Sequence, residues 1–431
     1  MTNDVGAGSG AVAGPGGLAA GRHAGARLPA LHAAWLTDQT LGLLRFGRRF
    51  PHPDGGAAYL GADGTPDLAA PVHTWITARM CHVYALGALA GVPGARPLAQ
   101  AALDGLRGRL ADTEHGGWLR GVDAGGEPLD GGEKSCYDHA FVLLAASSAL
   151  VAGLDGARET LDRASDVMLS RFWDDDAGMC VDTWDRPWTV LDPYRGVNAN
   201  MHTVEAFLAV GEALDDPAWY ERAARISSRV VAHAEGHDWR IPEHYDADWR
   251  PLLDLNDDNR ADQFKPYGAT VGHGLEWSRL LVQLAVLRPP DEAEGLVASA
   301  VELFDRAVAD GWAVDGAEGF VYTTDWSGAP VVRARMHWVA AEAVAAAWAL
   351  HDATGEARFL ERYATWWDHV ARYLVDEEHG SWHHELSPQN VPTADVWPGK
   401  PDVYHAFQAT LVPRLPRRPG LARAVAAGEL R

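Results

Sequence analysis

The sequence has 431 residues, 47% of them hydrophobic, and is long enough to bury a large core. Its 37 basic and 59 acidic side chains give a formal net charge of -22. Because this excess repels phosphate backbones and anionic membrane surfaces, it excludes nucleic acid as a partner. No run of about 18 uninterrupted apolar residues occurs, so we expect no membrane-spanning helix.

The first residues, 1–27, are rich in glycine and alanine and lack a continuous apolar run. This composition predicts a disordered N-terminal tail and not a signal peptide. No linker or shift in composition divides residues 28–431, so we expect a single domain there. The three cysteines, Cys81, Cys136 and Cys180, contain no C-x-x-C pair, which favours a reducing cytoplasm over a disulfide framework or a zinc site.

A unit of helix, glycine-aromatic strand and polar turn recurs along the chain after the tail. Its first copy is an amphipathic helix at 28–49, followed by a strand at 55–60 and a turn at 62–66. Six copies lie at intervals of roughly 60 to 80 residues, a period typical of repeat architectures. Their strand and turn segments lie at 55–66, 116–128, 178–184, 239–249, 319–330 and 380–392.

Between successive copies, the apolar periodicity predicts two helices. Examples of these pairs are expected at 75–90 and 98–110, 134–152 and 159–171, 201–214 and 219–234, 275–287 and 292–309, and 338–350 and 359–374. Twelve helices in six pairs can close into a ring whose inner helices are buried all round, and the alanine-rich run 339–348 suits such a position. We therefore predict an all-α fold, an (α/α)6 barrel of six helical-hairpin repeats with short β-hairpins at the connections.

A polar cluster stands near the start of each expected inner helix. The clusters are Arg79 with His82, Lys134 with Tyr137, His202 with Glu205, His273 with Glu276, His337 with Trp338 and Glu342, and Asp402 with Tyr404 and His405. If the inner helices run parallel, the clusters meet at one mouth of the barrel and line a common pocket.

The stretch 266–277 is central to this pattern, because His273, Glu276 and Trp277 share a face of a helix that begins beside His273. An imidazole, a carboxylate able to orient it and an aromatic wall suit acid–base chemistry on a neutral, hydroxyl-rich ligand. Taken alone, the stretch also fits a capping histidine beside an ordinary salt-bridging glutamate. Arg79 can stabilise a developing oxyanion because it keeps its own proton.

A metal site is the competing interpretation, since His202, Glu205, His273 and His405 are possible ligands. However, the chain has no H-E-x-x-H motif, and its H-x-x-x-H spacings fall beside the hairpins, outside the clusters. We therefore expect neither a metal ion nor another cofactor.

Five parts of the sequence resemble the N-acylglucosamine 2-epimerase family and, within it, the D-mannose isomerase branch. They are 75–84, 115–118 with 134–137, 198–206, 272–277 and 397–405. The fold of that family is the (α/α)6 barrel. The resemblance implies metal-free interconversion of sugars through ring opening and a cis-enediol or enediolate, with two histidines as acid–base catalysts.

By position, the resemblance implies that His273 and His405 are the two catalysts and that Arg79 polarises the O1/O2 side of the sugar. The residues it implies as supporting binders or pocket walls are His202, Glu276, Tyr137, Trp277, Trp338 and Asn198. Lys265 is also expected to bind substrate, although related enzymes often have arginine there. A single ammonium group cannot make the planar bidentate contact of a guanidinium, so that contact is a point of departure from the family.

These observations lead us to expect an aldose–ketose isomerase of D-mannose and D-fructose, a cytoplasmic monomer or homodimer with a monosaccharide substrate. Alternatives within the family are a 2-epimerase of N-acylglucosamine or cellobiose type and an isomerase of a sulfonated sugar, which would need more cations than the clusters supply. A glycoside hydrolase would need two carboxylates flanking the glycosidic bond that it cleaves, whereas histidines dominate the clusters. A non-catalytic sugar-binding protein would present the same pocket.

Overall fold

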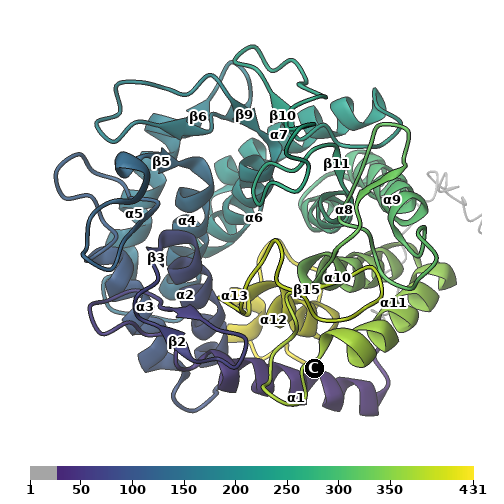
Figure 1. Ribbon diagram of the computed structural model, residues 1–431, viewed down its shortest axis with the longest axis horizontal. Helices are drawn as coiled ribbons and strands as arrows, with labels where there is room; N and C mark the ends of the chain where they lie inside the picture. Colours follow the sequence, from purple (N-terminus) through teal and green to yellow (C-terminus); the bar gives the residue numbers. More distant parts are fainter. Residues whose placement is uncertain (1–26) are drawn as a thin grey trace, which may run out of the picture.

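The computed structural model describes residues 27–431. The expected tail, residues 1–27, lies outside the described residues except for Arg27. Two concentric layers of helices form a ring around a central axis (Figure 1). The inner layer consists of α2 (Thr74–Leu89), α4 (Cys136–Val151), α6 (Val197–Leu214), α8 (Val271–Ala285), α10 (His337–Thr354) and α12 (Tyr404–Leu411). The outer layer consists of α1 (Ala30–Gly47), α3 (Ala95–Arg107), α5 (Ala157–Val167), α7 (Pro217–Glu235), α9 (Pro290–Gly311) and α11 (Ala357–His369).

The ring is closed, because each inner helix packs against the next and α12 packs against α2. Each inner helix also packs against the outer helix that follows it, except α12, whose outer neighbour is α1 from the other end of the chain. Thr40 of α1 and Thr410 of α12 share a hydrogen bond of 2.8 Å at this junction. The predicted (α/α)6 barrel is therefore confirmed, and its sixth helix pair joins the two ends of the described chain.

Burial separates the two layers as the sequence predicts. The inner helix α10 is buried on nearly every side, and its small alanine side chains allow close packing of neighbouring helices. The outer helices α3 and α11 bury one face only and expose the other. One hydrophobic core runs from Leu36 to Val425 and joins the layers around the ring.

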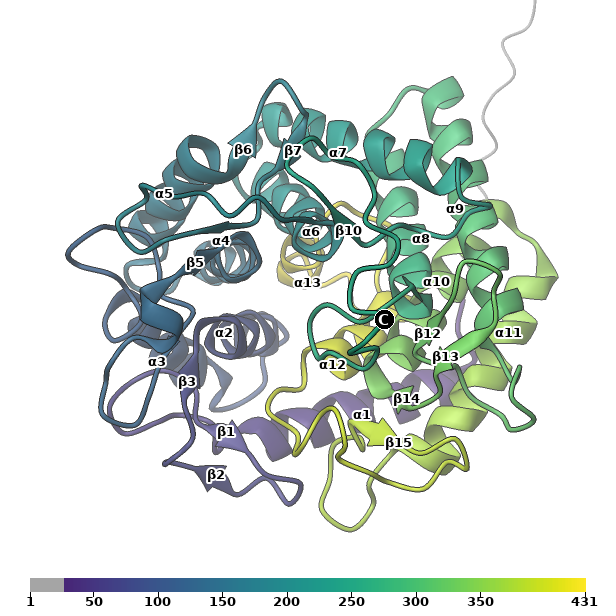
Figure 2. The same cartoon turned by 45° about the horizontal axis from the view of Figure 1, so that its top comes forward.

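Short antiparallel strands frame the end of the ring where the inner helices begin (Figure 2). They are β1 (Tyr59–Leu60), β2 (Pro66–Asp67), β3 (Val72–His73), β4 (Gly121–Val122), β5 (Lys134–Ser135), β6 (Trp173–Asp174), β7 (Met179–Cys180), β8 (Thr183–Trp184), β9 (Arg195–Gly196), β10 (His244–Tyr245), β11 (Ala269–Thr270), β12 (Thr323–Thr324), β13 (Pro330–Val332), β14 (Arg335–Met336) and β15 (Glu385–Leu386). Local hairpins form between β1 and β2, β6 and β7, and β12 and β13. The other pairs, such as β3 with β4, join the strand before an inner helix to a strand after the next outer helix. This pairing fixes where each inner helix begins.

Short turns of other helix types complete the described fold. They are 3-10 turns at Leu129–Gly132 and Val412–Arg414 and π turns at Met168–Phe172 and Val370–Leu374. A short final α-helix, α13 (Ala422–Ala426), lies near the C-terminus. Within residues 27–431, no helix is both long and apolar enough to cross a membrane. The three cysteines are buried free thiols. The cytoplasmic location and the oligomeric state remain predictions.

Gly272 illustrates how packing, rather than backbone freedom, explains one of the conspicuous glycines. Gly272 lies within α8, and the glycine of this region that adopts a positive φ is Gly268, with φ of 89°. A Cβ atom on Gly272 would lie 2.3 Å from the Trp338 ring. The glycine therefore allows Trp338 to approach the start of α8 closely.

Candidate active site

A pocket of about 650 Å³ opens at the end of the ring where the inner helices begin. Its lining includes eight predicted site residues, Arg79, Tyr137, Asn198, His202, His273, Glu276, Trp338 and His405. Further lining residues are Trp75, Gln263, Phe264, Pro266, Tyr322, His337, His384, Trp397, Pro401 and Asp402. The helical lining residues stand in the first two turns of parallel inner helices, so side chains from distant repeats converge on one cavity.

His273 lies in the first turn of α8, and its Nδ1 donates a hydrogen bond to Oε1 of Glu243 at 2.9 Å. Glu243 directly precedes β10, which pairs with the strand before α6. With the proton held on Nδ1, the other ring nitrogen, Nε2, is left as a base. We expected Glu276 to orient His273, and the structure corrects that expectation, because the carboxylate in contact is that of Glu243.

His405 forms a second pair of the same kind, with Nδ1 donating to Oε1 of Glu342 at 2.9 Å. The other carboxylate oxygen of Glu342 accepts a hydrogen bond from Nε of Arg279 at 2.8 Å. Burial, reinforced by the positive charge of Arg79, holds the pKa of His405 well below its ordinary value. His405 is therefore a neutral imidazole at neutral pH, able to accept a proton at Nε2.

Trp338 stands between the two histidines. Its ring centroid lies 5.2 Å from that of His273 and 5.8 Å from that of His405. Both contacts are tilted, with interplanar angles of 37° and 38°. The two imidazoles thus flank one aromatic wall of the pocket, which places two proton-transfer groups within reach of a single small ligand.

Arg79 supplies a fixed positive charge in the same pocket. Its NH1 group contacts Oδ2 of Asp402 at 3.2 Å, and NH2 donates to the Tyr137 hydroxyl at 2.9 Å. The guanidinium also lies 4.4 Å from the ring centroid of Phe141 and 4.8 Å from that of Trp75. Burial disfavours the charge, but Tyr137 and Asp402 hold the pKa above its ordinary value, so Arg79 stays protonated.

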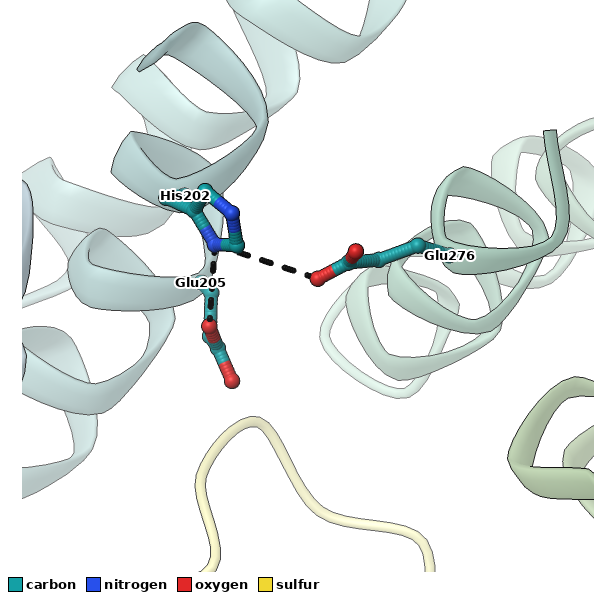
Figure 3. Close-up of side chains that lie close together, drawn as sticks. All are labelled: His202, Glu205 and Glu276. Carbon is teal, nitrogen blue, oxygen red and sulfur yellow. Dashed lines mark ion pairs between the residues drawn. The ribbon is translucent and has the colours of Figure 1, made fainter. Parts of the chain in front are cut away.

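His202 of α6 contacts Glu205 of the same helix and also Glu276, whose carboxyl group points toward it from α8 (Figure 3). His202 Nδ1 lies 3.7 Å from Oε2 of Glu205 and 3.8 Å from Oε1 of Glu276. Burial and the neighbouring charge of Glu342 raise the pKa of Glu276 well above its ordinary value. The raised pKa favours the protonated form of Glu276, which can donate a hydrogen bond, whereas the ionised form is paired with Arg279 NH2 at 3.4 Å.

Two groups of side chains have the composition of metal sites. The ligand atoms of His202, Glu205 and Glu276 lie within 4.8 Å of one another, as do those of Glu276, Glu342 and His405. However, Arg279 NH2 lies 3.4 Å from Glu276, and Arg279 Nε lies 2.8 Å from Glu342. A cation fixed between these carboxylates already supplies the compensating charge, which favours proton chemistry over metal binding at this position.

Trp277 and Lys265 are not part of the pocket, contrary to expectation. Trp277 is fully buried in the hydrophobic core, because the neighbouring position, Glu276, takes the side of α8 that faces the axis. Lys265 Nζ lies 3.8 Å from the ring centroid of Tyr194 and lines an adjoining hollow, which shares Trp75, Tyr137, Asn198 and Phe264 with the pocket. Lys265 is not among the residues that line the pocket with His273 and His405.

Several residues of the site were not assigned roles from the sequence. They are Glu243, Arg279, Glu342, His384, Gln263, Phe264 and Trp397. Glu342 belonged to a predicted cluster, and a search for one carboxylate per histidine would have selected it. Glu243 lies in the strand-and-turn segment 239–249, outside the starts of the inner helices where the polar clusters occur. His384 stacks on His337 with ring centroids 3.8 Å apart, a contact that only the fold creates.

Comparison with known proteins identifies the family to which this sequence is similar. The model of the N-acylglucosamine 2-epimerase (GlcNAc 2-epimerase) family matches residues 55–409. A D-mannose isomerase of Thermobifida fusca is 51% identical over 399 residues, which cover 92% of this chain and 98% of that protein. A D-mannose isomerase of Pseudomonas cannabina pv. alisalensis is 43% identical over 404 residues, which cover 93% of this chain and 96% of that protein.

Solved structures agree with the fold. A crystal structure of a D-mannose isomerase superposes with a TM-score of 0.82 and 28% identity, and the match covers 89% of this chain and 98% of that one. A cellobiose 2-epimerase from Spirochaeta thermophila DSM 6192 has a TM-score of 0.78 at 22% identity, covering 92% of this chain and 97% of that one. The second match shows a shared architecture only.

Proposed function

The chain belongs to the N-acylglucosamine 2-epimerase family and is an isomerase, and from this premise we propose that it interconverts D-mannose and D-fructose without a metal ion. One observation carries the proposal. Two histidines, each oriented by a glutamate through Nδ1, flank Trp338 in a pocket that also holds the fixed cation Arg79. Two proton-transfer groups and an anion-stabilising group are what an aldose–ketose isomerisation requires.

The first step is opening of the pyranose ring, which we assign to His273. Its Nε2 takes the proton of the O1 hydroxyl, which becomes the carbonyl of the open-chain aldose, and delivers that proton to the ring oxygen O5 as the C1–O5 bond breaks. Glu243 keeps the proton of the imidazole on Nδ1 before the step and stabilises the imidazolium form during it. Tyr137, Asn198 and His202 are placed in the lining to bind the hydroxyl groups of the sugar.

The second step is proton transfer between C2 and C1, which we assign to His405. Nε2 removes the C2 proton, the electron pair forms the C1–C2 double bond, and O1 takes up negative charge that Arg79 stabilises. The proton of the O2 hydroxyl moves to O1, and His405 returns its proton to C1 to give the ketose. In its protonated form, Glu276 is a supporting donor to the sugar oxygens.

Product analysis tests the proposal directly. The protein is incubated with D-mannose, and D-fructose and D-glucose are quantified by chromatography over time. Fructose formed first supports the aldose–ketose reaction. Glucose formed without fructose identifies a 2-epimerase, in which the proton returns to the opposite face of C2, and the absence of any product from mannose refutes the proposed substrate. N-Acylglucosamine and cellobiose in parallel reactions test the other substrates of the family.

A further inference from the structure

Arg279 lies on α8 one turn beyond Glu276 and is not part of the lining of the sugar pocket. It is only 2% exposed, so its charge is almost completely removed from water. Burial disfavours that charge, but Glu342, Glu205 and Glu276 hold the pKa above its ordinary value, and Arg279 stays protonated. A buried guanidinium is costly unless carboxylates compensate it, so the partners of Arg279 indicate what it does.

The guanidinium contacts two glutamates unequally. Nε donates to Oε2 of Glu342 at 2.8 Å, whereas NH2 lies 3.4 Å from Oε1 of Glu276. NH1 donates to Oε1 of Gln283 at 2.9 Å, which helps to hold the group in this orientation. Glu342 therefore receives the shorter and stronger of the two contacts.

Glu276 and Glu342 compete for this one cation. Atoms of the two carboxyl groups and of His405 lie within 4.8 Å of one another, and both glutamates are at most 2% exposed. Two carboxylates this close in a buried site do not readily ionise together. Burial and the charge of Glu342 raise the pKa of Glu276 well above its ordinary value. Burial also raises the pKa of Glu342, but the charge of Arg279 and its hydrogen bond oppose that rise.

The two carboxyl groups also differ in their hydrogen bonds. Oε1 of Glu342 accepts from His405 Nδ1 and Oε2 accepts from Arg279 Nε, an arrangement that suits an ionised carboxylate. In contrast, Oε2 of Glu276 is buried without a partner among residues 27–431, and Glu276 lines the sugar pocket. A proton on that oxygen makes it a donor to a hydroxyl group of the sugar.

We propose that Arg279 is a positioning residue that keeps Glu342 ionised as the acceptor for His405 and leaves the proton of the glutamate pair on Glu276. An ionised Glu342 can only accept, so the imidazole proton of His405 stays on Nδ1 and Nε2 remains a base. A protonated Glu342 would instead donate to Nδ1, which moves the imidazole proton to Nε2 and removes that base. Arg279 thus acts on the reaction through Glu342, without touching the sugar.

The other titratable groups around Glu342 do not replace Arg279. These groups are Glu205, His202, Glu276 and His405. The charge of Glu205 raises the pKa of Glu342 further. Burial lowers the pKa of His202 to about 4, so this imidazole is neutral at neutral pH. Within residues 27–431, Arg279 is therefore the one cation that pairs with Glu342 at neutral pH.

Arg279→Gln tests the proposal through the pH dependence of catalysis, and this test rests on the proposed isomerisation. Without the cation, Glu342 binds a proton at a higher pH. The acid limb of kcat/KM should therefore move upward by about 1 to 3 pH units, the effect of one adjacent opposite charge on a carboxyl group. Activity should recover as the pH rises. A loss of equal size at every pH would indicate a structural role only and would overturn the proposal.

Two further variants serve as controls for this shift. Arg279→Lys restores a positive charge near Glu342 and should return the acid limb most of the way to its original position. Arg288→Gln is the matched control, because it removes a guanidinium that pairs with Glu221 outside the pocket, and its pH profile should not change. A lysine variant that behaves like Arg279→Gln, or an equal shift in Arg288→Gln, overturns the proposal.

A second measurement needs no sugar and therefore separates this proposal from the proposed function. In protein labelled with nitrogen isotope at histidine, nuclear magnetic resonance signals of His405 are identified by their loss in His405→Asn. The unchanged protein should carry the imidazole proton on Nδ1, and Arg279→Gln should carry it on Nε2 at neutral pH. A proton that stays on Nδ1 in this variant overturns the proposal. The expected change together with no conversion of mannose supports the role of Arg279 and refutes only the proposed substrate.

If Arg279→Gln does not fold, the charge assignment is tested without changing Arg279. The infrared difference spectrum between the unchanged protein and Glu276→Gln at neutral pH should show loss of the C=O band of a protonated carboxyl group. Loss of carboxylate bands instead would show that Glu276 is ionised, which overturns the proposal. Thermal denaturation confirms that each variant used is folded.

Discussion

His405 donates a hydrogen bond from Nδ1 to Oε1 of Glu342 at 2.9 Å, across 63 positions of sequence. The contact joins α12 to α10, neighbours in the inner layer, and repeats the relationship between His273 and Glu243 on the other side of Trp338. In both pairs the carboxylate fixes the proton on Nδ1 and leaves Nε2 toward the pocket. Orientation of each imidazole is thus built into the ring and does not depend on the substrate.

Replacing Glu342 with glutamine should therefore reduce kcat strongly while the protein stays folded. The amide can present its NH₂ group to Nδ1, which favours the tautomer with the proton on Nε2 and removes the base. We expect a loss of about 10²- to 10⁴-fold, as when a general base is disabled. Steady-state kinetics with mannose measure the effect, and circular dichroism checks the fold.

Glu221→Gln is the control for this change, because Glu221 pairs with Arg288 at the surface, outside the pocket. That variant should keep the kcat of the unchanged protein. A Glu342→Gln variant with the same kcat would show that the carboxylate of Glu342 does not determine the tautomer of His405.

Arg79→Lys should be severely impaired although it preserves the charge. The guanidinium holds Asp402 with one nitrogen and Tyr137 with another, a fork that a single ammonium group cannot reproduce. If the contact tightens as O1 becomes negative, kcat falls as well as kcat/KM. Kinetics with mannose decide the point, and turnover close to that of the unchanged protein would exclude a bridging role.

The low pKa of His405 predicts the pH below which activity is lost. Burial and nearby positive charge shift the pKa below the ordinary value of about 6.5, so His405 gains a proton only at a more acidic pH. The base therefore stays available as the pH falls through 6.5, and kcat/KM should decline only below that value. A profile of kcat/KM against pH measures the midpoint, and an acid limb centred above pH 6.5 would contradict the assignment.

Removal of divalent metals should leave the isomerisation intact. Arg279 already lies between the carboxylates of Glu276 and Glu342, and Arg79 stabilises the oxyanion. Dialysis against a chelator, followed by measurement of fructose formation, tests this expectation. Activity that disappears after dialysis and returns with one added metal would show that a carboxylate group with His202 or His405 is a metal site.

The sequence predicts the ring and the end at which chemistry occurs, because both depend on periodic features. Six strand-and-turn segments set the number of repeats, and six polar clusters at the same phase mark the mouth. Helix order then brings together residues as distant as Arg79 and Asp402, which form a buried ion pair. These features can be predicted from the sequence because each repeat carries its own copy of them.

The pairing of individual side chains is not periodic and was not predictable. Glu243 orients His273 from a strand-and-turn segment and not from the start of an inner helix, and Glu276, three residues from His273 on α8, contacts His202 and Arg279 instead. Trp277 fits the helical spacing for a pocket wall, but the packing of neighbouring helices buries it in the core. Contacts between repeats depend on how the inner helices rotate against each other, which local spacing does not determine.

His273 and His405 should have separable roles, and isotope exchange distinguishes them. His273→Asn and His405→Asn should each lose most turnover, by roughly the 10²- to 10⁴-fold typical of an acid–base group. In deuterated water, the unchanged protein should place deuterium at C1 of fructose in partial yield, because direct return of the C2 proton competes with exchange. This labelling is followed by nuclear magnetic resonance.

The two variants should differ in exchange at C2. The His405 variant lacks the base that removes this proton, so exchange should stop with any form of the sugar. The His273 variant retains that base and lacks ring opening, so it should still exchange slowly with a sugar supplied in open-chain form. Asparagine preserves much of the size of histidine, and thermal denaturation confirms that each variant is folded. The opposite pattern would interchange the two roles, and full activity in either single variant would refute the pair.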